Sequence, residues 1–249
     1  MGPTMFNIAS STLTPVSPDN SFFKFADDGY LVVPGRNINS IPQELVHHQN
    51  WAANQNLKLN ISKTSEIVFY SRRSTTQPPP AIPGITRVTQ LKILGIIVDE
   101  KLNFQLHINE LIKSCAQALS ALKTLHHHGL SEESIQLTFT SKVLSKITYA
   151  SPAWSGFISE GSRDQLEGFL RKACRFKYYS PSKPTFSQLV IELESNLFHA
   201  ITTNPNHCLH YLLPPLKPSN YNLRNRGHSY TLPFKDDRNF FSRLLYRLV

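Results

Sequence analysis

The fold is decided by one stretch near the start of the chain, Asn20-Ser-Phe-Phe-Lys-Phe-Ala-Asp-Asp-Gly-Tyr-Leu-Val-Val-Pro34. Two apolar runs, residues 22–25 and 30–33, flank the adjacent carboxylates Asp27 and Asp28. Aromatic and β-branched residues on both sides of Asp-Asp-Gly are typical of a β-hairpin. The sequence therefore predicts a hairpin with Asp27 and Asp28 at its reversal.

The two adjacent carboxylates have two readings. A hairpin tip is a rigid support from which acidic oxygens reach a hard divalent cation. Mg²⁺ held by carboxylates and substrate phosphates is the usual arrangement for phosphoryl and nucleotidyl transfer. Asp and Gly are also ordinary turn residues, so the same stretch suits a turn that binds nothing. The hairpin residues alone do not distinguish a metal site from a simple turn, so the rest of the sequence is needed to choose between them.

The charge of the chain is unevenly distributed. The 249 residues carry a formal net charge of +9, with a pI of about 9.5. Residues 1–70 hold four Lys and Arg against five Asp and Glu, so the positive charge lies in the rest of the chain. This distribution suits a site for cations joined to a region that follows phosphates. The alternative is that the excess of basic residues serves solubility.

Cysteine usage and hydropathy indicate the compartment. The three cysteines, Cys115, Cys174 and Cys208, are far apart, which argues against a disulfide scaffold and favours an intracellular, reducing compartment. Nucleus and cytoplasm are not distinguished. No apolar run is long enough to span a membrane, and the first residues do not resemble a signal peptide.

Residues 1–103 mix extended and helical patterns. After the first hairpin we expect, in order, a helix over 41–57, strands at 57–60 and 66–70, a Pro-rich linker over 72–80 and a second hairpin over 88–98. Ser40 is the expected N-cap of the helix, with Pro42 in its first turn. Gly95 lies at the centre of the second hairpin.

From residue 104 the pattern becomes helical. Apolar residues at helical spacing predict an amphipathic helix over 104–125 that ends at Gly129. Ser131 caps a second helix, which Pro152 interrupts, and a third starts near Ser162. The outer side of this third helix is basic: Arg163, Arg171, Lys172, Arg175 and Lys177. Trp154, Tyr178 and Tyr179 are expected to serve core or surface packing and not base stacking. After Pro181 we expect shorter helices.

Several short motifs, in order along nearly the whole chain, resemble one family. The sequence looks like the C-terminal half of the reverse transcriptases of non-LTR retrotransposons, the LINE-like and jockey-like elements. The motifs are Gly2-Pro3, Phe25-Ala-Asp-Asp28, Trp51-Ala-Ala-Asn-Gln-Asn-Leu-Lys-Leu-Asn-Ile-Ser-Lys-Thr64, Leu91-Lys-Ile-Leu-Gly-Ile96 and Tyr149-Ala-Ser-Pro-Ala-Trp154. Four of them at reasonable spacing are far more specific than any one alone.

The resemblance implies an α+β fold in three parts. Residues 1–103 would be a partial polymerase palm, with the Asp-Asp hairpin, a helix, strands and a primer-grip-like hairpin. Residues 104–180 would be an all-α, thumb-like helical bundle, and residues 181–249 a Pro-rich basic C-terminal extension or tail. The activity implied is that of an RNA-directed DNA polymerase, with an RNA template and a DNA primer as partners.

The resemblance also assigns roles to individual residues. Asp27 and Asp28 would be ligands of catalytic Mg²⁺ (or Mn²⁺), and Lys63 would face the triphosphate of the incoming nucleotide. Gly95 would let the primer backbone approach closely; its alternative is a simple bulge. The basic side of the third helix would contact nucleic acid through phosphates, with Arg171, Lys172, Arg175 and Lys177 as the candidates.

The family's third catalytic carboxylate should precede the Asp-Asp hairpin. The one earlier candidate, Asp19, lies in a turn just ahead of the hairpin, which is the wrong context. We therefore expect a truncated copy that is inactive alone. The alternatives are a non-catalytic basic fragment that binds nucleic acid and an inert transposon remnant.

Overall fold

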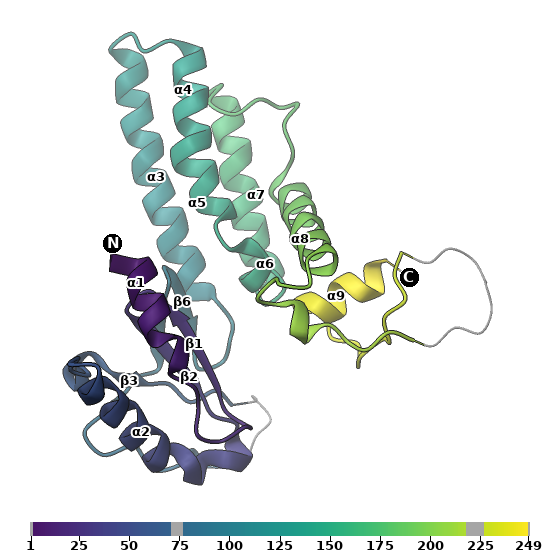
Figure 1. Ribbon diagram of the computed structural model, residues 1–249. Helices are drawn as coiled ribbons and strands as arrows, with labels where there is room; N and C mark the ends of the chain where they lie inside the picture. The colour runs from purple at the N-terminus through teal and green to yellow at the C-terminus, as the bar shows by residue number, and fades with distance from the viewer. Residues whose placement is uncertain (1, 71–76, 218–226, 249) are drawn as a thin grey trace. The chain divides into compact units, whose positions relative to one another are not determined.

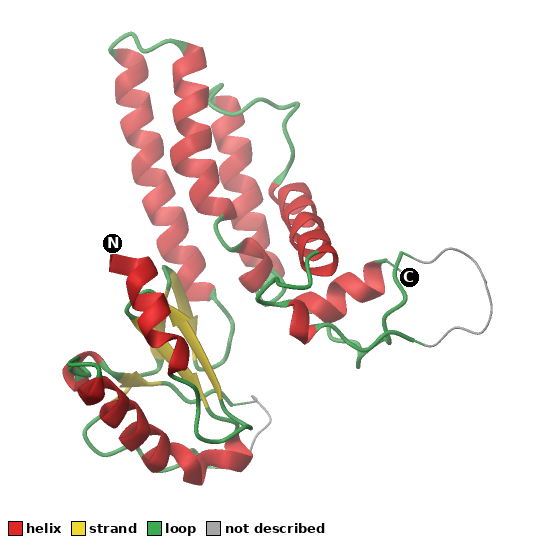
Figure 2. Ribbon diagram, in the orientation of Figure 1, coloured by secondary structure: helices red, strands yellow, loops and turns green. Residues whose placement is uncertain are grey.

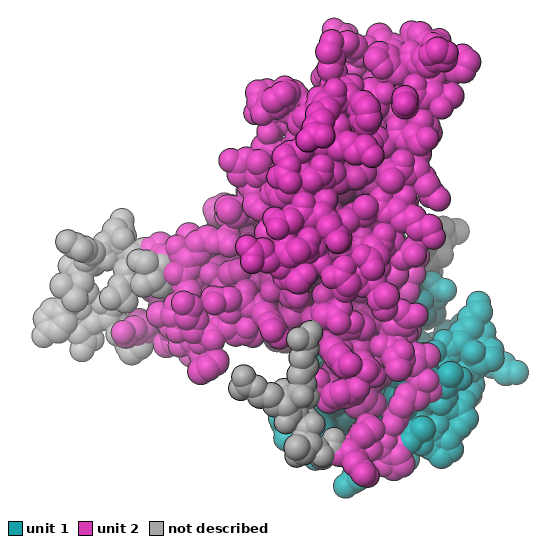
Figure 3. All heavy atoms as spheres, turned by 180° about the vertical axis from the view of Figure 1, so that it is seen from behind, with its two compact units in different colours: residues 1–66, 81–86 teal, residues 67–80, 87–249 magenta. Residues whose placement is uncertain are grey.

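The computed structural model of the chain describes residues 2–70, 77–217 and 227–248. It is an α+β structure in which helices predominate over short strands (Figures 1 and 2). In the described residues, each of the three sheets has two strands: β1–β2, β3–β4 and β5–β6. The chain divides into two compact units, residues 1–66 with 81–86 and residues 67–80 with 87–249 (Figure 3). Each unit is described separately below.

Unit 1 contains the first hairpin and one long helix. Its elements are α1 (Gly2–Ala9), η1 (Ser10–Thr12), β1 (Ser21–Phe25), β2 (Asp28–Val32), η2 (Gly35–Ser40), α2 (Ile41–Asn54), η3 (Ile61–Lys63) and β3 (Ser65–Glu66). The helix expected over 41–57 is present but ends three residues early. Pro42 occupies its first turn, as expected, whereas the Ser40 side chain makes no capping hydrogen bond. The Ser40 hydroxyl instead donates to the carbonyl of Asn37.

The two strands predicted after α2 are mostly absent. Residues 57–60 and 67–70 have no regular structure, and only Ser65–Glu66 (β3) pairs, with Thr86–Arg87 (β4). Alternating apolar residues favour a strand only where a neighbouring strand accepts their hydrogen bonds. Residues 71–76 of the predicted linker lie outside the described residues.

Unit 2 combines the second hairpin with a helical bundle. Its elements are β5 (Gln90–Ile93), β6 (Ile96–Asp99), α3 (Gln105–His127), α4 (Glu132–Phe139), a π-helical turn η4 (Thr140–Leu144), α5 (Ser145–Thr148), α6 (Ser151–Trp154), α7 (Glu160–Arg175), α8 (Phe186–Thr203), η5 (His210–Leu212) and α9 (Phe240–Arg247). The predicted hairpin and the first three helical patterns are confirmed. The second compact unit includes this hairpin together with the helices, and β6 packs on α3.

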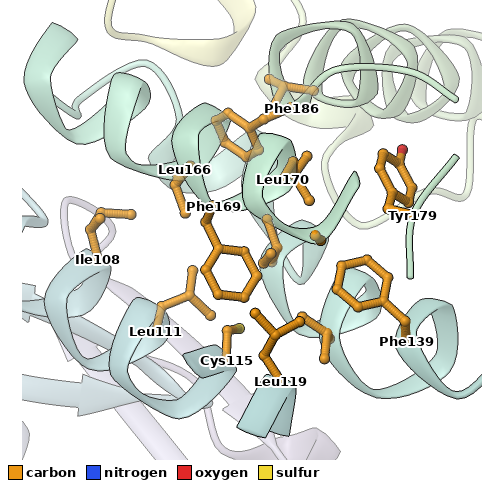
Figure 4. Packing of buried hydrophobic residues seen from close by; sticks show 14 of the residues in the cluster. Ile108, Leu111, Cys115, Leu119, Phe139, Leu166, Phe169, Leu170, Tyr179 and Phe186 are labelled. Carbon is orange, nitrogen blue, oxygen red and sulfur yellow. The ribbon is translucent and has the colours of Figure 1, made fainter. Parts of the chain in front are cut away.

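One apolar core holds the bundle of unit 2 together. Helix α3 contributes Leu111, Cys115 and Leu119, and Phe169 of α7 points towards them (Figure 4). Burial raises the pKa of the Cys115 thiol to about 11, so this cysteine stays protonated. Trp154, Tyr178 and Tyr179 are buried in the same core, as the sequence predicts.

The C-terminal part does not become a run of short helices. Helix α8 has 18 residues, and a complete capping box starts it: the Thr185 hydroxyl accepts from the amide of Gln188, and the Gln188 side chain accepts from the amide of Thr185. Pro181 and Pro184 precede this cap and therefore do not disturb the helix. The expectation of shorter helices after Pro181 is wrong for α8.

The structure also shows the state of the cysteines and the hydropathy of the helices. All three cysteines are free thiols, with Cys115 buried and Cys208 exposed. Among the residues that the structure describes, no helix is long and apolar enough to cross a membrane.

Candidate functional site

The β1–β2 hairpin places Asp27 and Asp28 at its tip. Phe25 pairs with Asp28, so the connection is a two-residue loop of Ala26 and Asp27. The reversal therefore lies one residue before the predicted Asp-Asp-Gly turn. Ala26 has a φ of 51°, in the left-handed region that residues other than glycine rarely occupy.

Gly29 lies within β2 rather than in the turn, and it leaves room for an aromatic ring. It pairs with Lys24, and a Cβ added to Gly29 would lie 2.7 Å from Cζ of Phe22. The Phe22 ring also meets His48 of α2 edge-on, with ring centroids 4.6 Å apart. Packing of Phe22 against a glycine and a helix fixes the hairpin on α2.

Both carboxylates of the tip face solvent. Asp27 and Asp28 are exposed, and the Tyr30 hydroxyl donates a hydrogen bond of 3.4 Å to Oδ2 of Asp28. Carboxylate oxygens are suitable ligands for Mg²⁺ and Mn²⁺, which often complete their coordination with water and phosphates. In the described part of the chain, no group of three or more His, Cys, Asp and Glu side chains is placed to hold a metal ion. The tip therefore offers two suitable donors and not a complete site.

A buried carboxylate fixes the base of the hairpin. Glu44 of α2 is fully buried and accepts hydrogen bonds from the amides of Val16 and Ser17, at 3.0 and 2.9 Å, and from the Asn20 side chain at 2.8 Å. Burial alone would raise the pKa of Glu44, but these hydrogen bonds and the nearby His48 together lower it. Asn20 directly precedes β1, so the ionised Glu44 ties the hairpin to α2.

Lys24 provides a second anchor for the hairpin. Its ammonium group donates to the carbonyls of Ser10 and Leu13, at the end of the first helical segment. Partial burial lowers the pKa of Lys24. The two carbonyls therefore hold a cation of β1 against the preceding helical turn.

Lys63 is presented by a self-contained turn. Asn60 Oδ1 accepts from the Ser62 hydroxyl and from the amide of Lys63, while the Thr64 hydroxyl donates to the Asn60 carbonyl. This explains the Asn-x-x-Lys-Thr pattern, because the Asn side chain caps the short helix η3. The Lys63 side chain itself is exposed.

The β5–β6 hairpin has a two-residue loop of Leu94 and Gly95. Ile93 pairs with Ile96, and the φ angles of the loop residues are 45° and 91°. A loop with two positive φ angles matches the right-handed twist of the strands and favours glycine at its second position. Gly95 is therefore a turn residue and not a bulge within a strand.

Sequence reasoning missed the residues that hold this second tip. The Tyr149 hydroxyl donates to the carbonyl of Leu94 at 3.0 Å, and the Trp154 indole donates to the carbonyl of Tyr149. The ring of His107 packs edge-on against Trp154, and burial, together with the charge of Lys92, lowers the pKa of His107. The Tyr149-Ala-Ser-Pro-Ala-Trp154 motif thus supports the hairpin tip, a link across 55 residues that local pattern does not reveal.

Three of the predicted basic residues, Arg171, Lys172 and Arg175, lie in the last turns of α7, Lys177 follows the helix, and Arg163 lies near its start. Arg171, Lys172 and Arg175 are exposed. Lys177 is also exposed, but it forms an ion pair of 3.5 Å with Glu132 of α4. Arg163 differs from the others because it is half-buried and donates to the carbonyl of Ser155.

The candidate residues belong to two units. Asp27, Asp28 and Lys63 lie in unit 1, whereas Gly95 and the basic residues of α7 lie in unit 2. The Glu44 and Lys24 anchors hold the hairpin that carries Asp27 and Asp28, and Tyr149 holds the tip that carries Gly95. The fold thus presents two hairpin tips, each held by side chains from elsewhere in its own unit.

Comparison with known proteins finds retrotransposon polymerases. The chain is 29% identical over 124 residues to the RNA-directed DNA polymerase from mobile element jockey of Drosophila melanogaster, covering 45% of this chain and 13% of that protein. It is 24% identical over 226 residues to the retrovirus-related Pol polyprotein from type-1 retrotransposable element R1 of Bradysia coprophila, covering 86% and 21%. It is 25% identical over 167 residues to the probable RNA-directed DNA polymerase from transposon X-element of Drosophila melanogaster, covering 62% and 17%.

These matches show to which proteins the chain is related. It is related to the reverse transcriptases of non-LTR, LINE-like retrotransposons. Within that class it is similar to the jockey, R1 and X-element proteins, and it spans about a fifth or less of their length. No family model matches the chain. No solved structure matches it either.

Proposed function

We propose that the chain is the part of a non-LTR retrotransposon reverse transcriptase that carries the Asp-Asp hairpin and the helical region after it. The reaction is RNA-directed DNA synthesis, in which a nucleotide passes from a dNTP to a primer 3′-hydroxyl. One observation supports this most: the adjacent carboxylates Asp27 and Asp28 lie exposed at a doubly anchored hairpin tip. The similarity to three retrotransposon polymerases makes that tip a candidate for catalysis.

In this proposal the residues of unit 1 serve the chemistry. Asp27 and Asp28 would hold Mg²⁺ or Mn²⁺, which would supply positive charge for the attacking 3′-oxygen and the leaving pyrophosphate. The hairpin anchors keep the strand that precedes these carboxylates in place. Lys63 adds positive charge near the triphosphate and can donate a proton to the leaving group.

The residues of unit 2 serve the nucleic acid. The β5–β6 tip at Leu94 and Gly95 approaches the primer, and Tyr149 holds that tip. The bundle formed by α3, α4 and α7 acts as a thumb. Arg171 and Arg175, which lie outside the lining of the groove described below, contact phosphates of the template–primer duplex, which positions it without reading its sequence.

Primer extension tests this proposal directly. The full chain is incubated with an RNA template, a DNA primer, dNTPs and Mg²⁺, as wild type, Asp27→Asn and the matched control Asp19→Asn. Asp19 is an exposed carboxylate outside the tip, paired with Arg36 at 3.4 Å. Incorporation that survives in the control and disappears in Asp27→Asn supports the proposal and overturns the expectation that the chain is inactive alone. Incorporation that is unchanged in Asp27→Asn contradicts it.

Metal binding provides a readout that does not depend on turnover. Electron paramagnetic resonance measures free Mn²⁺ in the presence of the wild type and of the Asp27→Asn, Asp28→Asn double variant. Binding that the double variant loses supports the assignment of the tip as a metal site. A wild type that binds no Mn²⁺, or a double variant that binds it equally, overturns that assignment.

The second candidate function is non-catalytic binding of nucleic acid. The exposed basic residues at the end of α7 favour it, since they need no metal. Fluorescence anisotropy with a labelled RNA–DNA hybrid at increasing salt measures the number of phosphates contacted. We expect Arg171→Gln to flatten the slope of log K against log salt by about one unit. Lys58→Gln, an exposed control in unit 1, should leave the slope unchanged.

A further inference from the structure

Helices α3 and α7 enclose an open groove on the surface of unit 2. Its volume is about 740 Å³, and its lining runs from Asn109 to Lys123 on α3 and from Gln165 to Phe176 on α7. At about 1.5 Å per residue, the lining of α3 is about 21 Å long. The groove is therefore long enough for three to four turns of an additional helix.

The floor of the groove is apolar. Ile112 and Ala116 of α3 line it together with Phe169 of α7 and Phe176 just after that helix, and Phe176 remains 39% exposed. Gly168 lies inside α7, where a glycine destabilises the helix relative to alanine. A Cβ at Gly168 would fit, since its nearest neighbour would be Nη2 of Arg171 at 3.7 Å. The missing side chain leaves the centre of the groove accessible to another backbone.

The rims of the groove are positively charged. Lys113 and Lys123 line it on α3, and Lys172 lines it on α7, while no Asp or Glu is among its described lining residues. Lys113 is 4.0 Å from Glu110, a neighbour one turn away on the same helix. Lys123 and Lys172 have no acidic partner within ion-pair distance in the part of the chain that the structure describes. The rims thus offer unpaired cations on both sides.

An apolar floor between basic rims favours one kind of occupant. A nucleic-acid duplex would pair its phosphates with the rims, but its stacked bases are internal and would leave the Ile, Ala and Phe floor without apolar partners. An amphipathic helix satisfies both parts, because its apolar stripe covers the floor and its acidic flanks meet the lysines. We propose that the α3–α7 groove docks an amphipathic α-helix of a protein partner, with Asp or Glu on both sides of an apolar stripe. This interaction is separate from the Asp27 site.

The probe is a designed helical peptide of about 18 residues, with Leu at positions i, i+4, i+7 and i+11 and Glu on both flanks. A second peptide has the same Leu stripe and Lys in place of every Glu. Fluorescence anisotropy with the full chain should give a Kd of about 10 µM for the acidic peptide and at least tenfold weaker binding for the basic one. Hydrogen exchange should show protection of residues 109–123 and 165–176. An acidic peptide that does not bind at about 100 µM overturns the proposal.

Two neighbouring residues of α3 provide matched variants. Ala116→Glu puts a negative charge in the floor, whereas Gln117→Glu puts the same charge on an exposed position outside the lining. We expect the first to weaken binding of the acidic peptide about tenfold and the second by less than about twofold. Equal effects of the two variants contradict the proposal. A labelled RNA–DNA hybrid that loses affinity only in Ala116→Glu also contradicts it, because the groove is then a nucleic-acid site.

Gly168→Ala separates binding from folding. Replacing a glycine inside a helix by alanine should raise the Tm by about 2 °C, since the added Cβ fits. The same methyl group narrows the groove and should weaken binding of the acidic peptide about threefold. A variant that is more stable yet binds less cannot be explained by loss of fold. Unchanged peptide affinity in this stabilised variant, together with an unaffected Ala116→Glu, overturns the proposal.

Discussion

At the scale of single residues, both hairpin tips contain a strained loop residue. Ala26 and Leu94 each occupy the first loop position with a positive φ, of 51° and 45°. The left-handed conformation costs a non-glycine residue about 1–2 kcal/mol, and such strain concentrates at functional sites. Each tip is held by contacts from its own unit, Lys24 near the first and Tyr149 at the second.

Replacing Ala26 by glycine should relieve strain at the first tip. Glycine adopts positive φ freely, although it also raises the conformational entropy of the unfolded chain. We expect the relief of strain to be larger, which gives a net stabilisation of about 0.5–1 kcal/mol. Chemical denaturation followed by the NMR signals of unit 1 measures it. Ala53→Gly, at an exposed position near the end of α2, is the control and should destabilise. Destabilisation by Ala26→Gly would show that the strain is not relieved.

Leu94→Asn tests the second tip in the same way. Asparagine tolerates the left-handed region, and Asn-Gly is the preferred pair for a loop with two positive φ angles. Leu94 is 38% exposed, so the substitution loses only part of a buried apolar contact. Relief of strain should exceed that loss and raise the free energy of unfolding by about 0.5 kcal/mol. If the tip acts in primer binding, the stabilised variant should also extend primers more slowly. Denaturation and primer extension together give the two readouts.

At the scale of elements, a buried charge cluster attaches α9 to α8. Glu194 of α8 is 1% exposed and forms ion pairs with Arg243 and Arg247 of α9, the latter at 3.0 Å. The Ser155 hydroxyl donates to the same carboxylate at 3.1 Å. Gly156 provides space for Arg243, since a Cβ there would overlap the guanidinium group. The C-terminal helix is therefore part of the fold of unit 2.

Glu194→Ala should detach α9. Removing one partner of a buried ion pair leaves an uncompensated charge, so we expect unfolding to become easier by about 3 kcal/mol. Hydrogen exchange should show that α9 loses protection while α3 keeps it. The matched control is Glu192→Ala, an exposed carboxylate two residues away that should change little. Equal protection of α9 in both variants would argue against the anchoring role of Glu194.

At the scale of the whole molecule, the two units are stabilised differently. Unit 2 has one large and one small apolar cluster, whereas the buried apolar side chains in the described residues of unit 1 are Leu13 and Ala52. Buried polar groups make up the rest of that interior, namely Ser10, Asn20, Glu44 and His48. The stability of unit 1 therefore depends on the ionised carboxylate of Glu44, whereas that of unit 2 depends mainly on the burial of apolar side chains.

The stability of unit 1 should fall in acid. The folded state lowers the pKa of Glu44 below its ordinary value of 4.5. Its contribution is therefore fully present above that value, and it is lost as the pH falls towards the folded pKa. The indole N–H signals of Trp51, in unit 1, and Trp154, in unit 2, report the two units separately. On lowering the pH from about 6 to 3, we expect the Trp51 signal to change first.

Glu44→Gln is the variant that checks this mechanism. It removes the charge that three donors share, so unit 1 should lose about 2 kcal/mol near neutral pH. Its remaining stability should depend less on pH between about 3 and 5 than that of the wild type. A Trp51 signal that shows the same acid transition in both proteins would assign the transition to another group.

Much of the fold and the candidate site could be predicted from local sequence. Both hairpins were predicted because apolar runs and turn residues lie within about a dozen positions. The first three helical patterns of unit 2 are predicted from their 3.6-residue period, and the predicted cap Ser131 accepts a hydrogen bond from the amide of Ser134. The strands predicted at 57–60 and 66–70 were wrong except at Glu66, because strand formation needs a partner that the local pattern cannot specify.

The sequence by itself determined the two hairpin tips and placed the adjacent carboxylates Asp27 and Asp28 at the first of them. It also determined the relationship to retrotransposon polymerases. Each of these rests on short motifs of consecutive residues. Only the tertiary structure decided which groups hold those tips. Glu44 reaches across 28 residues to Val16, and Tyr149 across 55 to Leu94. The α3–α7 groove likewise exists only when two distant helices pack. Such contacts depend on burial and on the free energy of desolvating a charge, which a residue acquires from its neighbours in space.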